Sequence, residues 1–207
     1  MKHITKDYSD IALVITIWLT HINKNIFRKG MVIIMEATLI DLKTRRSCRK
    51  FKAEQIKEDV LNKILEAGTF APTGMGKQSP IMIAVQDKEI LEKLSKMNAA
   101  VAGMTSDPFY GAPTVVVVLA DRNISTYLED GSLVMGNLMN AAHALGIASC
   151  YVYRAKQVFE SEEGKALLQE WGIKGDYVGI GNCILGYSDE VGTKTVAPRK
   201  TDYIVRV

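Results

Sequence analysis

The uninterrupted run of mostly β-branched residues at Thr114–Ala120, with the sequence TVVVVLA, restricts the fold more than any other feature of the chain. Such residues favour extended strands. A strand with one face in water alternates apolar and polar side chains, and this run does not alternate, so both of its faces must be covered. We therefore expect a buried strand at the centre of a sheet.

The segment Gly131–Leu145 predicts a long helix that is apolar on nearly every side. Its apolar residues are Leu133, Val134, Met135, Leu138, Met139, Ala141, Ala142 and Leu145. A helix without a polar face must be covered all round, so it either forms the centre of the domain or meets a partner chain. Gly146 is expected to end it.

The rest of the pattern from Met35 onward predicts further helices and strands. We expect helices at Glu36–Lys43, Ile56–Leu65 (ended by Gly68), Lys88–Met97 and Gly164–Trp171, and strands at Ile81–Val85, Ala148–Tyr153, Tyr177–Tyr187 and Tyr203–Val207. Phe70–Pro80 and Asn98–Pro113 are expected to be loops. Helices and strands alternate irregularly, and no repeat or linker interrupts residues 35–207. We therefore predict one α+β domain with a central sheet covered by helices.

Composition narrows the class of protein. A net charge of +3 over 207 residues gives no reason to expect nucleic acid or a membrane surface as a partner of the whole chain. Cys48, Cys150 and Cys183 are far apart and lack the spacing of a zinc site, and their odd number indicates reduced thiols in the cytoplasm. Of the three histidines, two precede residue 35, so we expect neither a histidine-based metal site nor a catalytic triad.

Residues 1–34 precede this pattern. Ile11–Leu19 is an apolar run between basic residues, but it is too short to span a bilayer, and no A-x-A-like cleavage site follows it. We therefore favour an N-terminal extension, or translation that starts at Met35, over a working signal peptide. The predicted domain boundary lies between residues 34 and 35.

Basic residues gather just after the first predicted helix, at Lys43, Arg45, Arg46, Arg49, Lys50 and Lys52. In the segment from Arg45 to Phe51, guanidinium groups can bind a phosphate bidentately, and Ser47 adds a hydroxyl donor. Taken alone, such a run is more often a solvated basic face, with a nucleic-acid role as a further alternative.

Three further segments carry groups that could face a planar ligand. The first is Ala71–Pro80, with Gly74 and Gly76, and the second is Gly146–Arg154, with Tyr151 and Tyr153. The third is Gly179–Tyr187, which Pro198-Arg199-Lys200 follows. In isolation each has a plainer interpretation, as a turn, a core strand or a glycine-containing strand. No G-x-G-x-x-G opens a helix in the last of them, so a dinucleotide-binding Rossmann motif is excluded.

Taken in order, these segments resemble the FMN-dependent nitroreductase family. The set is R-R-S-x-R-x-F from Arg45, A-P-T-G-x-x-x-Q from Ala71, L-x-N-A-A-H-A-L-G-I from Leu138, L-G-Y from Leu185 and P-R-K from Pro198. The resemblance covers residues 35–207. It implies a three-layer sandwich with a central, mostly antiparallel or mixed sheet flanked by helices. It also implies an intertwined homodimer, bound FMN, and NADH or NADPH as the electron donor.

The resemblance also implies roles for particular residues. Arg45, Arg46 and Ser47 match positions that hold the flavin phosphate and ribityl chain, and Arg49 matches a further basic position of the cofactor site nearby. Arg199 matches a C-terminal phosphate contact. Phe70, Pro72, Thr73 and Gly74 match the loop that reaches the flavin from the other subunit, and Gln78 follows it with a side chain able to hydrogen-bond the ring. Tyr151, Val152 and Tyr153 match the segment beside the isoalloxazine ring, and Met75 and Tyr153 are candidates for lining the substrate site.

The chain also departs from the family pattern. Gly76 stands where many relatives have Asn, Ser79-Pro80 replaces a common Pro-Trp, and Tyr153 is bulkier than the usual small residue. These changes fall in the pocket beside the ring, so the resemblance predicts the cofactor better than the substrate.

The predicted mechanism leaves the redox chemistry to the flavin, so we expect no catalytic side chain and no metal. The expected activity moves hydride from NADH or NADPH through flavin N5 to nitroaromatics, quinones or similar electron-poor acceptors, by a ping-pong mechanism. The alternatives are a flavin-binding or storage protein with little turnover, a flavin-dependent dehalogenase-like relative, and a nucleic-acid-binding protein that uses Lys43–Lys52. The low net charge and the lack of a recognised motif argue against the last.

Overall fold

The structure, a computed structural model, describes residues 36–190 and 195–207. The chain divides into two compact units, residues 1–44 and residues 45–207. In the first unit, residues 36–44 are helical, which agrees with the helix predicted at Glu36–Lys43. Leu39, Ile40 and Leu42 of this helix are each more than half exposed. The domain boundary predicted after residue 34 lies outside the described residues.

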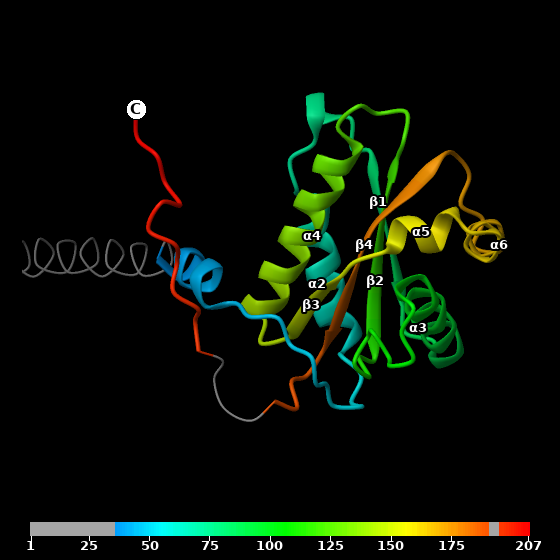
Figure 1. The fold of residues 1–207 in the computed structure, drawn as a ribbon, viewed down its shortest axis with the longest axis horizontal. Helices are drawn as coiled ribbons and strands as arrows, with labels where there is room; N and C mark the ends of the chain where they lie inside the picture. The colour runs from blue at the N-terminus through cyan, green and yellow to red at the C-terminus, as the bar shows by residue number, and fades with distance from the viewer. Residues whose placement is uncertain (1–35, 191–194) are drawn as a thin grey trace, which may run out of the picture. The chain divides into compact units, whose positions relative to one another are not determined.

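The second unit is built on a four-stranded antiparallel sheet with the strand order β1-β2-β4-β3 (Figure 1). The strands are β1 (Pro80–Val85), β2 (Thr114–Asp121), β3 (Ala148–Val152) and β4 (Tyr177–Gly186). The predicted central strand is confirmed, because β2 pairs with β1 on one side and with β4 on the other. Residues 115–120 of β2 have no exposed surface.

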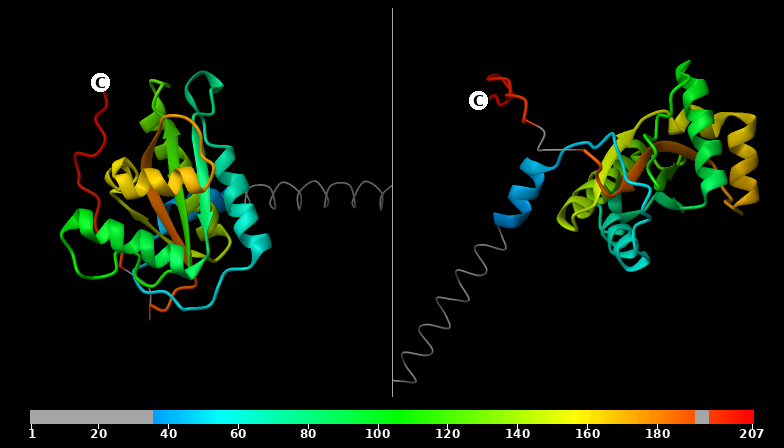
Figure 2. Two further views of the ribbon diagram at one scale, coloured as in Figure 1. Left: turned by 90° about the vertical axis from the view of Figure 1, so that its right-hand side faces the viewer. Right: turned by 90° about the horizontal axis from the view of Figure 1, so that it is seen from below.

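Helices cover both faces of this sheet. One face is covered by α2 (Glu58–Thr69) and α4 (Tyr127–Ala144), and the other by α3 (Lys88–Ala102), α5 (Ala155–Glu160) and α6 (Glu162–Glu170) (Figures 1 and 2). Successive side chains of a strand point to opposite faces. Val115, Val117 and Leu119 accordingly join the core beside α3 and α5, whereas the residues between them join the core beneath α2 and α4. The predicted three-layer α+β sandwich is confirmed.

Two glycines have roles that the sequence did not reveal. Gly68 was expected to end a helix, but it lies inside α2, where a Cβ would stand 2.6 Å from Sδ of Met82. Gly131 was expected to begin a helix, but α4 starts at Tyr127, and a Cβ at Gly131 would meet the side chain of Ile180 at 2.5 Å. At both positions glycine provides room for close packing, not a break in the helix.

Other differences concern the lengths of elements. Helix α3 continues past the predicted end at Met97 to Ala102, where Gly103 takes a left-handed conformation with φ of 62° and caps it. Helix α5 was not predicted. The strand predicted at Tyr203–Val207 is wrong, because these residues form no strand and are exposed. An alternating pattern makes a strand only where a neighbouring edge is available to pair with it.

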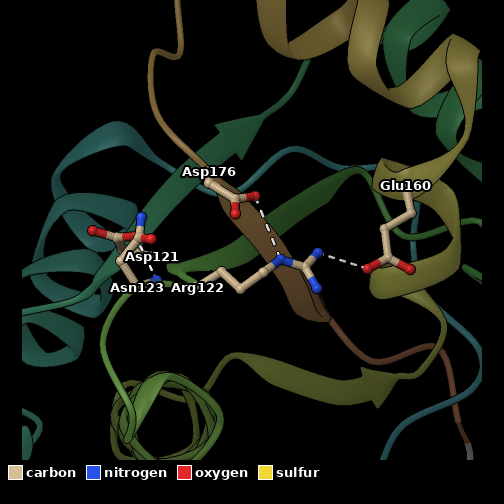
Figure 3. Close-up of polar contacts among 5 residues, drawn as sticks. All are labelled: Asp121, Arg122, Asn123, Glu160 and Asp176. Atoms are coloured by element: carbon tan, nitrogen blue, oxygen red, sulfur yellow. Dashed lines mark hydrogen bonds and ion pairs between the residues drawn. The ribbon is translucent and has the colours of Figure 1, made fainter.

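An ion-pair network fixes the turn after β2 (Figure 3). Nη2 of Arg122 lies 2.7 Å from Oε1 of Glu160 at the end of α5, and its Nε lies 3.4 Å from Oδ1 of Asp176, just before β4. The backbone N–H of Arg122 also donates to the carbonyl oxygen of Asp176 at 2.8 Å. These partly exposed groups contribute little free energy each. Together they join the ends of three elements.

Candidate functional site

The basic segment predicted to bind phosphate runs along the edge of the sheet. Ser47 pairs with Ser149 of β3 in a parallel bridge, and the N–H of Cys48 donates to the carbonyl oxygen of Ser149 at 3.0 Å. Further along, the N–H of Lys52 donates to the carbonyl oxygen of Tyr187, which follows β4, at 2.9 Å. The cluster is therefore held at a fixed place on the sheet and does not lie on a free arm.

Arg45 and Ser149 both present buried polar atoms at this edge. Nη1 of Arg45 and Oγ of Ser149 are buried, and neither has a hydrogen-bond partner among the described residues. Leaving such groups unpaired costs free energy, most of all for a cation. An anion with several oxygen acceptors would satisfy both, as a phosphate monoester does.

The position of Cys183 identifies the face of the sheet on which the Ser149 side chain lies. Cys183 pairs with Tyr151, and Ser149 lies two residues before Tyr151, so the three side chains share the face beneath α4. Burial raises the pKa of the Cys183 thiol to about 12; neighbouring Cys150 adds to the rise, and the positive charge of Arg45 opposes it. The Arg45 guanidinium therefore lies near enough to Cys183 to influence its thiol.

The outer part of the basic cluster is partly neutralised. Nζ of Lys50 lies 2.9 Å from Oδ2 of Asp189, and this hydrogen-bonded pair raises the pKa of Lys50 and lowers that of Asp189. The side chain of Arg49 is exposed, and its backbone N–H donates to Oε1 of Glu190 at 2.8 Å. The residues of the cluster that can bind an anion from the buried side are therefore Arg45 and its half-buried neighbours Arg46 and Ser47.

The three residues predicted to lie beside the flavin ring differ in the burial and hydrogen bonding of their side chains. The hydroxyl of Tyr151 donates to the carbonyl oxygen of Ile180 at 2.7 Å, and its ring lies so close to Gly181 that a Cβ there would be 2.6 Å from Cζ. Burial, with a smaller effect of Tyr153, raises the pKa of Tyr151. Val152 is buried in the core on the opposite face. Tyr153 is 62% exposed and presents a free aromatic face.

The loop predicted to approach the flavin is exposed and unusual in its backbone. Phe70 is 78% exposed and Met75 is 83% exposed. Met75 and Gln78 have φ of 53° and 49°, a left-handed conformation that side-chain-bearing residues rarely adopt. Inside the loop, Oγ1 of Thr73 accepts the N–H of Gln78 at 3.1 Å. Pro72 is exposed and Gly74 is half-buried.

A buried carboxylate, Asp130 in the first turn of α4, anchors this loop. Its Oδ1 accepts the N–H of Gly74 at 2.9 Å, and its Oδ2 accepts the hydroxyls of Ser79 at 2.8 Å and Thr126 at 3.1 Å. Burial raises the pKa of Asp130, but the three hydrogen bonds outweigh that effect and hold the pKa below its ordinary value. This residue was not predicted. It stands just before the predicted helix Gly131–Leu145, beside a second acid, Glu129, and no local pattern distinguished the two.

The basic segment and the loop lie at opposite ends of the sheet, and the residues predicted to lie beside the ring, Tyr151–Tyr153, follow β3 between these ends. Ser149 pairs with Leu185, which pairs with Thr114 at the start of β2, whereas the loop enters β1 at Pro80, opposite Ala120 at the far end of β2. These ends are separated by roughly 20 Å, at about 3.4 Å per residue. In Figure 1 the loop before β1 stands at the top and β3 begins at the bottom. One chain therefore does not bring Arg45 and the loop together.

Arg199, the predicted C-terminal phosphate contact, is exposed, and its Nη2 donates to the carbonyl oxygen of Ala197 at 3.1 Å. A cavity of about 710 Å³ lies elsewhere, between α3 and residues 105–113. The described part of the chain contains no cluster of histidine, cysteine or acidic residues that could hold a metal. None of its helices is long and apolar enough to cross a membrane.

Comparison with known proteins gives consistent matches. Residues 42–103 match a family profile described as Nitroreductase family. A protein of Archaeoglobus fulgidus, provisionally named NADH dehydrogenase/NAD(P)H nitroreductase, is 33% identical over 159 residues, which are 74% of this chain and 86% of that protein.

Two crystal structures extend the likeness to the fold. A nitroreductase with bound FMN from Bacteroides fragilis has 31% identity and a TM-score of 0.76 over 82% of this chain and 98% of its own. A nitroreductase with bound FMN from Desulfitobacterium hafniense has 28% identity and a TM-score of 0.73 over 82% of this chain and 97% of its own.

Proposed function

Because this chain belongs to the nitroreductase family, we propose that it binds FMN and uses it to pass hydride from NADH or NADPH to small electron-poor acceptors. Nitroaromatics and quinones are the acceptor classes that we propose. FMN supplies the redox chemistry, accepting hydride from the nicotinamide and giving it to the acceptor. The protein's part is to bind the cofactor, leave one face of its ring accessible and shape the space above that face.

The observation that carries the proposal is the pair of buried unsatisfied atoms at the sheet edge, Nη1 of Arg45 and Oγ of Ser149. The terminal phosphate of FMN has the charge and the acceptor oxygens that these groups lack. Nη2 of Arg46 is buried as well, and its Nη1 donates to the carbonyl oxygen of Arg45, so we assign the main role in phosphate binding to Arg45. Arg46, Ser47, Arg49 and Arg199 are proposed as additional contacts to the phosphate and ribityl chain.

Tyr151 and Val152 support the ring site in different ways. The Tyr151 hydroxyl is hydrogen-bonded to the carbonyl oxygen of Ile180, and Val152 points into the core on the other face of the sheet. The flavin ring would therefore contact the backbone of residues 151–153 and the flat side of the Tyr151 ring. Tyr153 is the exposed side chain of the three and is proposed to border the space for substrate.

A second copy of the chain is needed to complete the site. The loop with Phe70, Pro72, Thr73, Gly74 and Gln78 lies at the opposite end of the sheet from Arg45, so we propose that it contributes to the FMN site of a partner subunit. Exposed apolar side chains, including Phe70, Met75 and Leu133, would be covered in such a homodimer. Met75 of one chain and Tyr153 of the other are then proposed to line one shared substrate space.

One shared space has a kinetic consequence. Nicotinamide and acceptor both require the reactive position of the flavin ring at near-attack distance, roughly 3–3.5 Å. Residues 151–153 would cover one face of the flavin ring, so the two substrates would have to use the other face in turn. We therefore propose a ping-pong mechanism.

The visible spectrum of the purified protein tests the proposal. We expect a flavin spectrum, bleaching when NADH or NADPH is added without oxygen, and rapid return of the colour when a quinone or nitroaromatic follows. If the flavin colour bleaches but an added acceptor does not speed its return, the protein stores flavin and is not an enzyme of this kind. A protein that neither carries flavin nor takes it up from solution would refute the proposal.

A further inference from the structure

The loop between α2 and β1 is held in a conformation that it would not keep by itself. Met75 and Gln78 are in the left-handed region, which is unfavourable for residues that carry a side chain. Met75 makes little contact, being 83% exposed. A strained, exposed loop persists only when its surroundings determine its shape.

Asp130 is the group that determines it. Its carboxylate bonds Gly74 at one end of the loop and Ser79 at the other, so it closes the loop across its base. Thr126, the residue before α4, donates to the same carboxylate and also lies against Gly74, where a Cβ would collide with its hydroxyl. A negative charge in the first turn of a helix is favoured by the helix dipole. The anchor is therefore rigid and charged.

The anchored loop cannot serve the FMN site proposed for its own chain. Its phosphate end, at Arg45 and Ser149, lies at the start of β3, roughly 20 Å along the strands from the end of the sheet where the loop lies, and β1 and β3 are the two outer strands of the sheet, with β2 and β4 between them. The loop can therefore act at an FMN site only in another copy of the chain.

We propose that Asp130 is a positioning residue that acts across the dimer: it fixes residues 73–79 so that they complete the FMN site formed around Arg45 of the partner copy. This inference rests on the proposed function. Asp130 itself touches neither cofactor nor substrate. Its effect is transmitted through the backbone of Gly74 and the position of Ser79.

Single variants give the first test, with FMN affinity measured by fluorescence titration of the flavin-free protein. Asp130→Ala should weaken FMN binding at least about tenfold, since hydrogen bonds to a charged group are lost. Asp130→Asn should retain most of the affinity, because its amide oxygen can accept from Gly74 and the two hydroxyls can turn to accept from its NH₂ group. Glu129→Gln, at the exposed neighbouring acid, is the matched control and should bind FMN like the wild type.

A mixed dimer gives the decisive test. One copy carries Arg45→Ala and the other carries Asp130→Ala, and the mixed species is isolated with two different affinity tags. If Asp130 acts on the partner, one site keeps a native Arg45 and a native loop, whereas the other has lost both. The mixed dimer should then bind one FMN with wild-type affinity and show about half of the wild-type activity.

If Asp130 acts only within its own chain, or only on general stability, the mixed dimer would have two weakened sites and no tight one, and the inference would be overturned. Should Asp130→Ala fail to fold, Ser79→Ala removes one bond of the same anchor and replaces it in both tests. A wild-type protein that takes up no FMN would overturn the proposed function. If the wild type binds FMN tightly but the mixed dimer has no site of wild-type affinity, only this inference is overturned.

Discussion

The side-chain amide of Asn98 on α3 donates a hydrogen bond to the backbone carbonyl oxygen of Tyr153 at 2.8 Å. Asn98 has no exposed surface, whereas Tyr153 is 62% exposed. Arg154, which follows, has φ of 81° and precedes α5. A helix on one face of the sheet thus holds, from behind, the segment that presents Tyr153 to solvent.

Asn98→Ala should therefore affect both stability and substrate recognition. The free energy of unfolding should fall by about 1–3 kcal/mol, because the Tyr153 carbonyl loses a buried partner. The KM for acceptors should rise more than kcat falls, because Tyr153 is no longer held in place. Urea unfolding and steady-state kinetics measure the two effects, with Lys96→Ala on the exposed side of α3 as control. An unchanged KM in a folded variant would show that Asn98 is structural only.

Arg45→Ala should weaken FMN binding by roughly 10- to 150-fold, the equivalent of about 1.5–3 kcal/mol for lost charge-assisted hydrogen bonds. Chromatography of the released cofactor should identify FMN and not FAD. Lys63→Ala, which removes an exposed cation on α2, should leave the affinity unchanged. If the Arg45 variant holds FMN as tightly as the wild type, the phosphate site has been assigned to the wrong residue.

The protein should be a homodimer at all concentrations at which it carries FMN. Leu133 is 46% exposed on α4, and a monomer would leave it in water together with Phe70 and Met75. Light scattering on a dilution series measures the mass, and Leu133→Asp should weaken the association. A stable monomer loaded with FMN would contradict the dimeric site.

Removal of residues 1–34 should leave the domain intact. These residues carry none of the family-like motifs, and they lie outside the described residues. A chain that starts at Met35 should keep its FMN and its midpoint of thermal unfolding. A loss of folding on truncation would mean that the apolar run Ile11–Leu19 is part of the domain.

Initial rates should follow a ping-pong pattern, with parallel reciprocal plots at different acceptor concentrations. The physical reason is the proposed site, in which only one face of the flavin ring would be accessible and nicotinamide and acceptor would have to occupy it in turn. Met75→Ala and Tyr153→Gly, which change the proposed lining, should alter the KM of both substrates. Intersecting lines, or a crystal structure with both ligands bound at one FMN, would exclude a shared site.

Much of the fold was predictable because burial leaves a periodic signal. The Val-rich strand β2 and the apolar helix α4 were recognised from side chains that lack a polar face. In the structure β2 is buried on both faces, whereas α4 buries one face on the sheet and leaves Leu128 and Leu133 exposed. The misassigned boundaries fell at Gly68 and Gly131. There, glycine is required by a neighbour that is distant in sequence, such as Ile180, and a local pattern does not show this contact.

The site was predictable only in part for a related reason. Arg45 could be named because it stands in a recognisable motif, but its unsatisfied Nη1 depends on the place that the fold gives it. Ser149 and Asp130 were missed, because an ordinary serine in a strand and an acid in a first helical turn do not reveal their partners. Val152 was named for a motif position, although its side chain faces the opposite core.

The burial of Cys183 protects the protein from a hazard of its own proposed chemistry. Reduced flavins also react with dioxygen, and that side reaction releases peroxide. Peroxide oxidises thiolates far faster than thiols. With a pKa of about 12 and no exposed surface, Cys183 stays a neutral thiol although it lies near the arginine proposed to hold the cofactor. Cys48 and Cys150 are buried as well. Repeated turnover in air should therefore leave all three sulfurs unoxidised.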